Sequence, residues 1–145
     1  MTPLNLTKQP PRSPRGELGG LCMLPRMIDI ARAKLPGGDI GQYQIGRGMS
    51  GVVLRHLGME VSEFIELVRN ARDDEEVATQ LKGRRTEREN RAVSLRLPRM
   101  TVKDVPEDLR ESFERFYGGD QPPNRHVFDI LEEDDVKAFG PNEKG

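Results

Sequence analysis

The chain has 145 residues and a net charge of −1, with 34% hydrophobic residues, 5% aromatic residues and no Trp. Its length suits one domain, and its low apolar content predicts a thin core joined by long polar connections. The near-neutral charge disfavours nucleic acid as a partner, and the lack of ~18 consecutive apolar residues disfavours a membrane.

Residues 1–20 are predicted to form an extended, proline- and arginine-rich N-terminal arm that packs on the domain. They hold four prolines and few apolar residues, and proline interrupts regular helix. After Gly20, Pro25 suits the first turn of a helix. The apolar residues of this first helix recur at helical spacing as far as Leu35.

A glycine-rich loop is predicted next, because residues 37–51 contain six glycines. Within and just after them, residues 46–53 match the GxGxxGxV pattern with which protein kinases cover ATP phosphates. The lysine, HRD and DFG elements that a kinase also needs are absent, so a flexible loop is favoured over a phosphate cradle. Residues 52–57 fit a short strand or the start of a helix equally well.

The middle of the chain is predicted to be helical. An apolar stripe indicates a second helix over residues 62–70. Asp73 with Glu76, and likewise Thr86 with Glu89, form pairs typical of helix starts. Such side chains accept hydrogen bonds from the free N–H groups of a first turn.

Two more helices are expected, one opened by Pro106 and one that ends at Phe139. The total is five or six short helices with little or no sheet, which predicts an all-α fold. We expect a single helical domain over residues 21–140 and a disordered tail over residues 141–145. The single cysteine, Cys22, cannot form an internal disulfide, which favours the reducing cytoplasm.

Charge is unevenly distributed along the chain. Residues 1–57 carry 8 basic and 3 acidic residues, whereas residues 101–145 carry 6 basic and 12 acidic residues. The favoured interpretation is that the basic first part lies against the acidic last part. The alternative is a basic face that binds an anion.

One cluster of charged residues is a candidate anion site near the first helix. Its members are four arginines and one aspartate: Arg12, Arg15, Arg26, Arg32 and Asp29. Arginine forks donate paired hydrogen bonds to a carboxylate or phosphate, and Asp29 would hold one arginine in place. The alternative is that these arginines fix the arm through backbone carbonyls and the acidic C-terminal third.

No catalytic residue, metal site or cofactor is predicted. His56 and His126 are the only histidines, and their spacing does not let two ligands converge from one helical turn. The basic stretch over residues 82–91 is interrupted by glutamates, so a solvated helix face is favoured over a DNA-binding helix.

Residues 11–15 (PRSPR), 24–29 (LPRMID) and 127–132 (VFDILE) carry a family resemblance. With these segments the chain resembles domain-of-unknown-function family 5069, a family of uncharacterised small bacterial proteins. The resemblance spans most of the chain and implies a small, mainly helical cytoplasmic protein, but no activity, cofactor or substrate. The chain departs from the family at Ile30, where relatives tend to carry lysine, and in the glycine-rich stretch after Tyr43.

Three functions are compatible with the sequence. The first is a non-enzymatic binding domain whose arginines contact a small anionic ligand or an acidic protein surface. The second is a small enzyme that acts on an anionic metabolite, with Asp29 or His56 as the acid–base group. The third is a scaffold that works as an oligomer, although the sequence does not fix the oligomeric state.

Overall fold

The computed structural model describes residues 1–141 as a mostly helical structure with one short antiparallel hairpin. The α-helices of these residues are α1 (Leu24–Ala33), α2 (Gly48–Leu57), α3 (Val61–Asn70), α4 (Asp74–Leu81), α5 (Glu87–Arg96), α6 (Glu107–Tyr117) and α7 (Val127–Phe139). The hairpin strands are β1 (Glu17–Leu18) and β2 (Leu21–Cys22), and two 3-10 helices are η1 (Leu97–Arg99) and η2 (Val102–Asp104). The prediction of a predominantly helical fold is confirmed.

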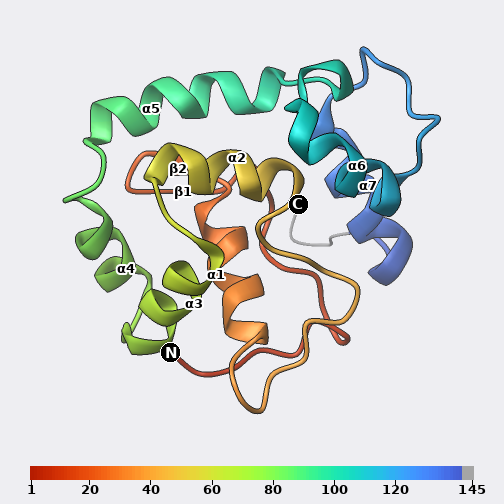
Figure 1. Ribbon diagram of the computed structural model, residues 1–145. Coiled ribbons are helices and arrows are strands. Elements are labelled where there is room, and N and C mark those ends of the chain that lie inside the picture. Colours follow the sequence, from red (N-terminus) through yellow and green to blue (C-terminus); the bar gives the residue numbers. More distant parts are fainter. Residues whose placement is uncertain (142–145) are drawn as a thin grey trace.

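Helix α1 lies in the middle of the molecule (Figure 1). It packs against α3, while the hairpin contacts α1, α4 and α5. On the other side α2 packs against α6, and α6 and α7 lie at the end of the molecule opposite α4 (Figure 1). The arrangement leaves α1 and the start of α2 facing α6 and α7.

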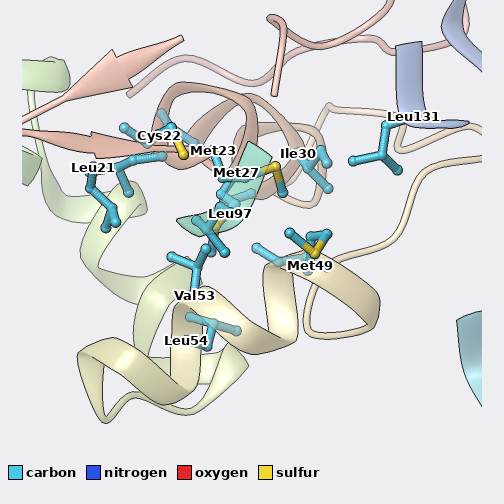
Figure 2. Packing of buried hydrophobic residues seen from close by; sticks show 14 of the residues in the cluster. Leu21, Cys22, Met23, Met27, Ile30, Met49, Val53, Leu54, Leu97 and Leu131 are labelled. Atoms are coloured by element: carbon cyan, nitrogen blue, oxygen red, sulfur yellow. The ribbon is translucent and has the colours of Figure 1, made fainter. Parts of the chain in front are cut away.

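The core is built mainly from α1 and the helices around it. Met27 and Ile28 of α1 and Phe64 and Val68 of α3 are fully buried. Figure 2 shows side chains of α1 facing those of α2, with Leu131 extending from α7 toward the same end of the core. Each such burial contributes roughly 1.5–3 kcal/mol to stability.

Seven α-helices are found in residues 1–141, where five or six were expected. The additional helix is α2, which begins at Gly48, inside the segment that we expected to be a loop. Glycine weakens a helix by up to ~1 kcal/mol, but Met49, Val53 and Leu54 are buried and offset this cost. Tertiary packing therefore overrides the local preference for a loop.

Residues 1–20 contain short turns at 6–8, 14–15 and 19–20 and the strand β1, and otherwise lack regular secondary structure. Leu6 is 1% exposed and anchors this segment, since its N–H donates to the Asp39 carbonyl at 2.8 Å. The Asp39 N–H returns a hydrogen bond to the Leu4 carbonyl at 3.0 Å. Of the predicted disordered tail, residues 142–145 lie outside the described residues.

Within residues 1–141, none of the helices combines the length and the apolar character needed to cross a membrane.

Candidate small-molecule site

Arg12 forms a forked ion pair with Asp29. Its Nε and Nη2 atoms donate to the two carboxylate oxygens of Asp29 at distances of 3.0 to 3.2 Å. Its Nη1 atom donates to Asp74 of α4 at 2.6 Å, and its backbone N–H donates to Asp29 at 2.8 Å. Asp29 thus joins the N-terminal segment to α1, and the donors of Arg12 are used within the chain.

Arg15 and Arg32 are also bonded within the chain, to different partners. Arg15 lies against α7, where it contacts Glu132 at 2.7 Å and Asp129 at 2.8 Å. Arg32 donates from Nε to the carbonyl of Thr2 at 2.8 Å. These are the carbonyl and acidic contacts that the alternative interpretation expected, and they do not converge on a shared site.

Arg26 differs from the other three arginines because it is 3% exposed. Its Nη1 and Nη2 atoms form a forked pair with Asp135 of α7 at 2.8 and 3.1 Å. Its guanidinium also lies 5.5 Å from the ring centroid of Tyr43. Its Nη1 atom also donates to the Arg12 carbonyl at 3.3 Å, and Arg26 lines a cavity.

The cavity has a volume of about 150 Å³ and lies between α1, the segment that leads into α2, α6 and α7. Its polar wall is formed by Arg26, Gln42, Tyr43, Arg47, Tyr117 and Asp134. Its apolar wall includes Met23, Ile30, Met49, Phe113, Phe116 and Leu131. An apolar cavity with a few convergent polar groups is the usual form of a small-molecule site.

The first turn of α2 opens onto this cavity. Gly48, Met49 and Ser50 line it, and their backbone N–H groups have no acceptor among residues 1–141. Arg47, in extended conformation, precedes the helix, and no acidic residue occupies the first turn. Free N–H groups and the positive end of a helix dipole both favour a bound anion.

Arg47 adds an exposed guanidinium at the edge of the cavity. Its Cζ atom lies 5.9 Å from the ring centroid of Phe116, so the arginine stacks on an aromatic side chain of α6. No ion pair of Arg47 is found among residues 1–141. This arginine therefore contributes a positive charge that no carboxylate in this part of the chain neutralises.

Two tyrosine hydroxyls face the same region. Tyr43 donates to Asp135 at 2.8 Å and so supports the carboxylate that holds Arg26. Tyr117 of α6 also lines the cavity. Burial raises the pKa of Tyr117 to about 12, so this hydroxyl remains a neutral donor at pH 7.

Asp134 is the carboxylate on the cavity wall. It is partly buried on α7 and accepts a hydrogen bond from Gln42 at 3.4 Å. Its pKa is raised by burial and, to a lesser extent, by the neighbouring charge of Asp135. Within residues 1–141 Asp134 forms no ion pair, whereas Asp135 pairs with Arg26.

The two acid–base candidates do not line this cavity. Asp29 is held by Arg12, as described above, and His56 contacts Asn90 through Nε2 at 2.8 Å, between α2 and α5. Residues 1–141 also contain no group of three or more His, Cys, Asp or Glu arranged to hold a metal ion.

Of the five residues in the predicted anion cluster, Arg26 alone lines the cavity. Tyr43, Arg47, Tyr117 and Asp134 also line it, and none of these four was predicted from the sequence. The position of Arg47 could have been predicted, because a glycine-rich segment followed by apolar residues also fits a loop that leads into a helix N-terminus. The tyrosines and Asp134 come from distant segments, and no local pattern links them.

Comparison with protein families gives a match over most of the chain. The model of a family described as Domain of unknown function (DUF5069) matches residues 8–136. No curated protein matches the chain.

Proposed function

Because the chain belongs to the family described as Domain of unknown function (DUF5069), whose description names no activity, we propose a function from the cavity itself: non-enzymatic binding of a small organic anion. The observation that carries the proposal is the convergence of Arg26, Arg47 and the free N–H groups of α2 on one cavity. Arg47 and the helix terminus are two positive groups of independent origin that border the same space, and the Arg26–Asp135 pair lies beside them.

The charge balance of the wall favours an anion. Arg26 is already paired with Asp135, so these two groups contribute little net charge. Arg47 and the first turn of α2 supply the positive potential of the wall.

The size and lining of the cavity limit the ligand. A cavity of about 150 Å³ accepts a molecule of roughly six to ten non-hydrogen atoms, since an engineered protein cavity of that volume holds benzene. Phe113, Ile30 and Leu131 offer an apolar surface for its body. We therefore propose a carboxylate with a short aliphatic or aromatic body as the class of ligand.

The direct test compares 4-methylpentanoate with its neutral amide, 4-methylpentanamide, by isothermal titration calorimetry. The two molecules have nearly the same shape, so a preference for the carboxylate measures recognition of charge. We expect saturable binding of the carboxylate and a dissociation constant at least about tenfold higher for the amide, since a charge-assisted hydrogen bond contributes roughly 1.5–3 kcal/mol.

Arg47→Gln is the matched variant, because Arg47 is exposed and its loss leaves the core intact. It should weaken binding of the carboxylate by about tenfold. Arg88→Gln removes an equally exposed arginine from α5, away from the cavity, and should leave the affinity unchanged. Equal losses in the two variants, or no saturable binding of the carboxylate to the wild-type protein, would overturn the proposal.

A further inference from the structure

The charges on the cavity wall point to a more specific ligand than a simple anion. We infer that the cavity binds a small apolar α-amino acid as its zwitterion, with the carboxylate at Arg47 and the α2 N-terminus and the ammonium at Asp134. This inference rests on the proposed function and names the substrate class of the same site.

The first step is the distribution of charge over the wall. Arg26 and Asp135 neutralise each other through two hydrogen bonds. Two charges then remain without a close partner in residues 1–141: the guanidinium of Arg47 and the carboxylate of Asp134. A ligand with one positive and one negative group complements both, whereas a simple anion leaves Asp134 buried beside a second negative charge.

The second step concerns Asp134. Its carboxylate lies among Asp135, Glu133 and Lys137 of α7, Arg26 of α1 and Tyr117 of α6. The burial of Asp134 and the charge of Asp135 penalise its ionised form. An ammonium group at hydrogen-bond distance would remove that penalty, because an opposite charge within a few ångström favours the ionised carboxylate.

The third step is the aromatic surface near Asp134. Tyr117, Phe116 and Tyr43 border the cavity together with Asp134. Ring faces attract ammonium groups, and the hydroxyl of Tyr117, a residue of this wall, can act as a further acceptor. Aromatic rings beside a carboxylate form a suitable environment for an ammonium group.

The fourth step fixes the side chain of the ligand. Met23, Ile30, Met49 and Leu131 form an apolar part of the wall, and all four are labelled in Figure 2. Methionine side chains adapt to the shape of an apolar neighbour. A branched or linear aliphatic side chain suits this surface, so amino acids of the size of valine, leucine, isoleucine and methionine are the expected ligands.

The test uses three molecules that share the same branched aliphatic group: leucine, 4-methylpentanoate, which lacks the ammonium, and 3-methylbutylamine, which lacks the carboxylate. Their dissociation constants for the full chain are measured by isothermal titration calorimetry at pH 7. We expect leucine to bind at least about tenfold more tightly than either of the others, since each lost contact is a charge-assisted hydrogen bond.

Asp134→Asn separates the ammonium contact from the rest of the site. Asp134 forms no ion pair in residues 1–141, so the variant should remain folded, which its unfolding temperature checks. It should reduce the affinity for leucine to that for 4-methylpentanoate, and leave binding of 4-methylpentanoate unchanged or slightly stronger. An unchanged affinity for leucine would overturn the inference.

The outcomes also separate the two proposals. Equal binding of leucine and 4-methylpentanoate to the wild-type protein would overturn the zwitterion while leaving the anion site standing. Tightest binding of 3-methylbutylamine would overturn both, because it would assign a cation to the cavity. Failure of all three molecules to bind, with valine, isoleucine and methionine also inactive, would likewise overturn both.

Discussion

At the scale of single residues, Arg26 both lines the cavity and joins α1 to α7 through its ion pair with Asp135. It is 3% exposed and its partner Asp135 is 14% exposed, so the pair is held largely out of water. Removal of one member of such a pair leaves an uncompensated charge in a poorly solvated place. Burial therefore makes this ion pair far more consequential than the exposed pairs of Arg15.

We predict that Arg26→Met lowers the free energy of unfolding by about 3–5 kcal/mol, because Asp135 loses its only cationic partner among residues 1–141. Urea denaturation, followed by far-ultraviolet circular dichroism, measures the change. Arg15→Ala is the control, since its pairs with Asp129 and Glu132 are about half exposed and should contribute less than ~1 kcal/mol. Similar losses of unfolding free energy in the two variants would contradict the distinction between the buried and the exposed ion pairs.

The candidate site was only partly predictable at this scale. Arg26 stood out because arginine in an amphipathic helix start is compatible with a charged ligand. Asp134 did not, since an acidic run near the end of a chain is typical of a solvated helix. Its orientation toward the cavity depends on the packing of α7 against α1 through Arg26 and Asp135. These two residues are far apart in the sequence, so no local pattern predicts their contact.

At the scale of elements, the entry into α2 is the feature on which the cavity depends. Gly46 has a φ of 90°, a conformation that L side chains rarely adopt. A Cβ atom at this position would also collide with Cγ2 of Val61 in α3. Glycine is thus required here by the backbone conformation and by the close approach of α3.

We predict that Gly46→Ala lowers the free energy of unfolding by about 2 kcal/mol or more, because strain and steric overlap add. Gly83→Ala is the matched control: a Cβ atom added there would meet no atom within 4 Å, and the φ of Gly83 is not in the left-handed region. That substitution should change stability by less than about 0.5 kcal/mol or increase it. Chemical denaturation of both variants provides the comparison.

The helix starts show why some elements were predictable and α2 was not. Thr86 accepts a hydrogen bond from the Glu89 N–H at 3.1 Å, and Asp73 accepts one from the Glu76 N–H at 2.9 Å, so both predicted starts are confirmed. Capping is local chemistry between residues three positions apart. Helix α2 instead depends on burial of its apolar face against distant helices, which overrides the composition of its first turn.

At the scale of the whole molecule, opposite charges connect the two ends of the chain. Arg15 and Arg26 come from the basic first part, and their partners Asp129, Glu132 and Asp135 lie on α7 in the acidic last part. The favoured interpretation of the uneven charge distribution, intramolecular complementarity, agrees with these pairs. Stability should therefore depend on the ionisation of carboxylates across the molecule.

In the part of the chain that the structure describes, five carboxyl groups have a pKa below the ordinary value. The backbone N–H groups of Glu60, Thr86 and Thr101 donate to three of them, and Arg55 and Arg125 pair with the other two. The five groups are Glu63, Glu89, Asp104, Asp108 and Glu133. With a lowered pKa, the folded state binds fewer protons than the unfolded state, so this stabilisation is present at neutral pH and is lost as the pH falls.

We predict that the unfolding temperature decreases as the pH is lowered from about 5 to 3, through the range in which these carboxyl groups take up protons. Asp134 opposes the trend weakly, because its raised pKa makes protonation favour the folded state. Glu89→Gln keeps a side-chain acceptor for the Thr86 N–H but cannot titrate, so its decrease should be smaller. Calorimetric scans of both proteins at pH 7, 5, 4 and 3 make the comparison. An unfolding temperature that stays constant or rises toward pH 3 would contradict the prediction. It would show that burial of Asp134, rather than the exposed capping and ion-pair carboxylates, dominates the proton balance of folding.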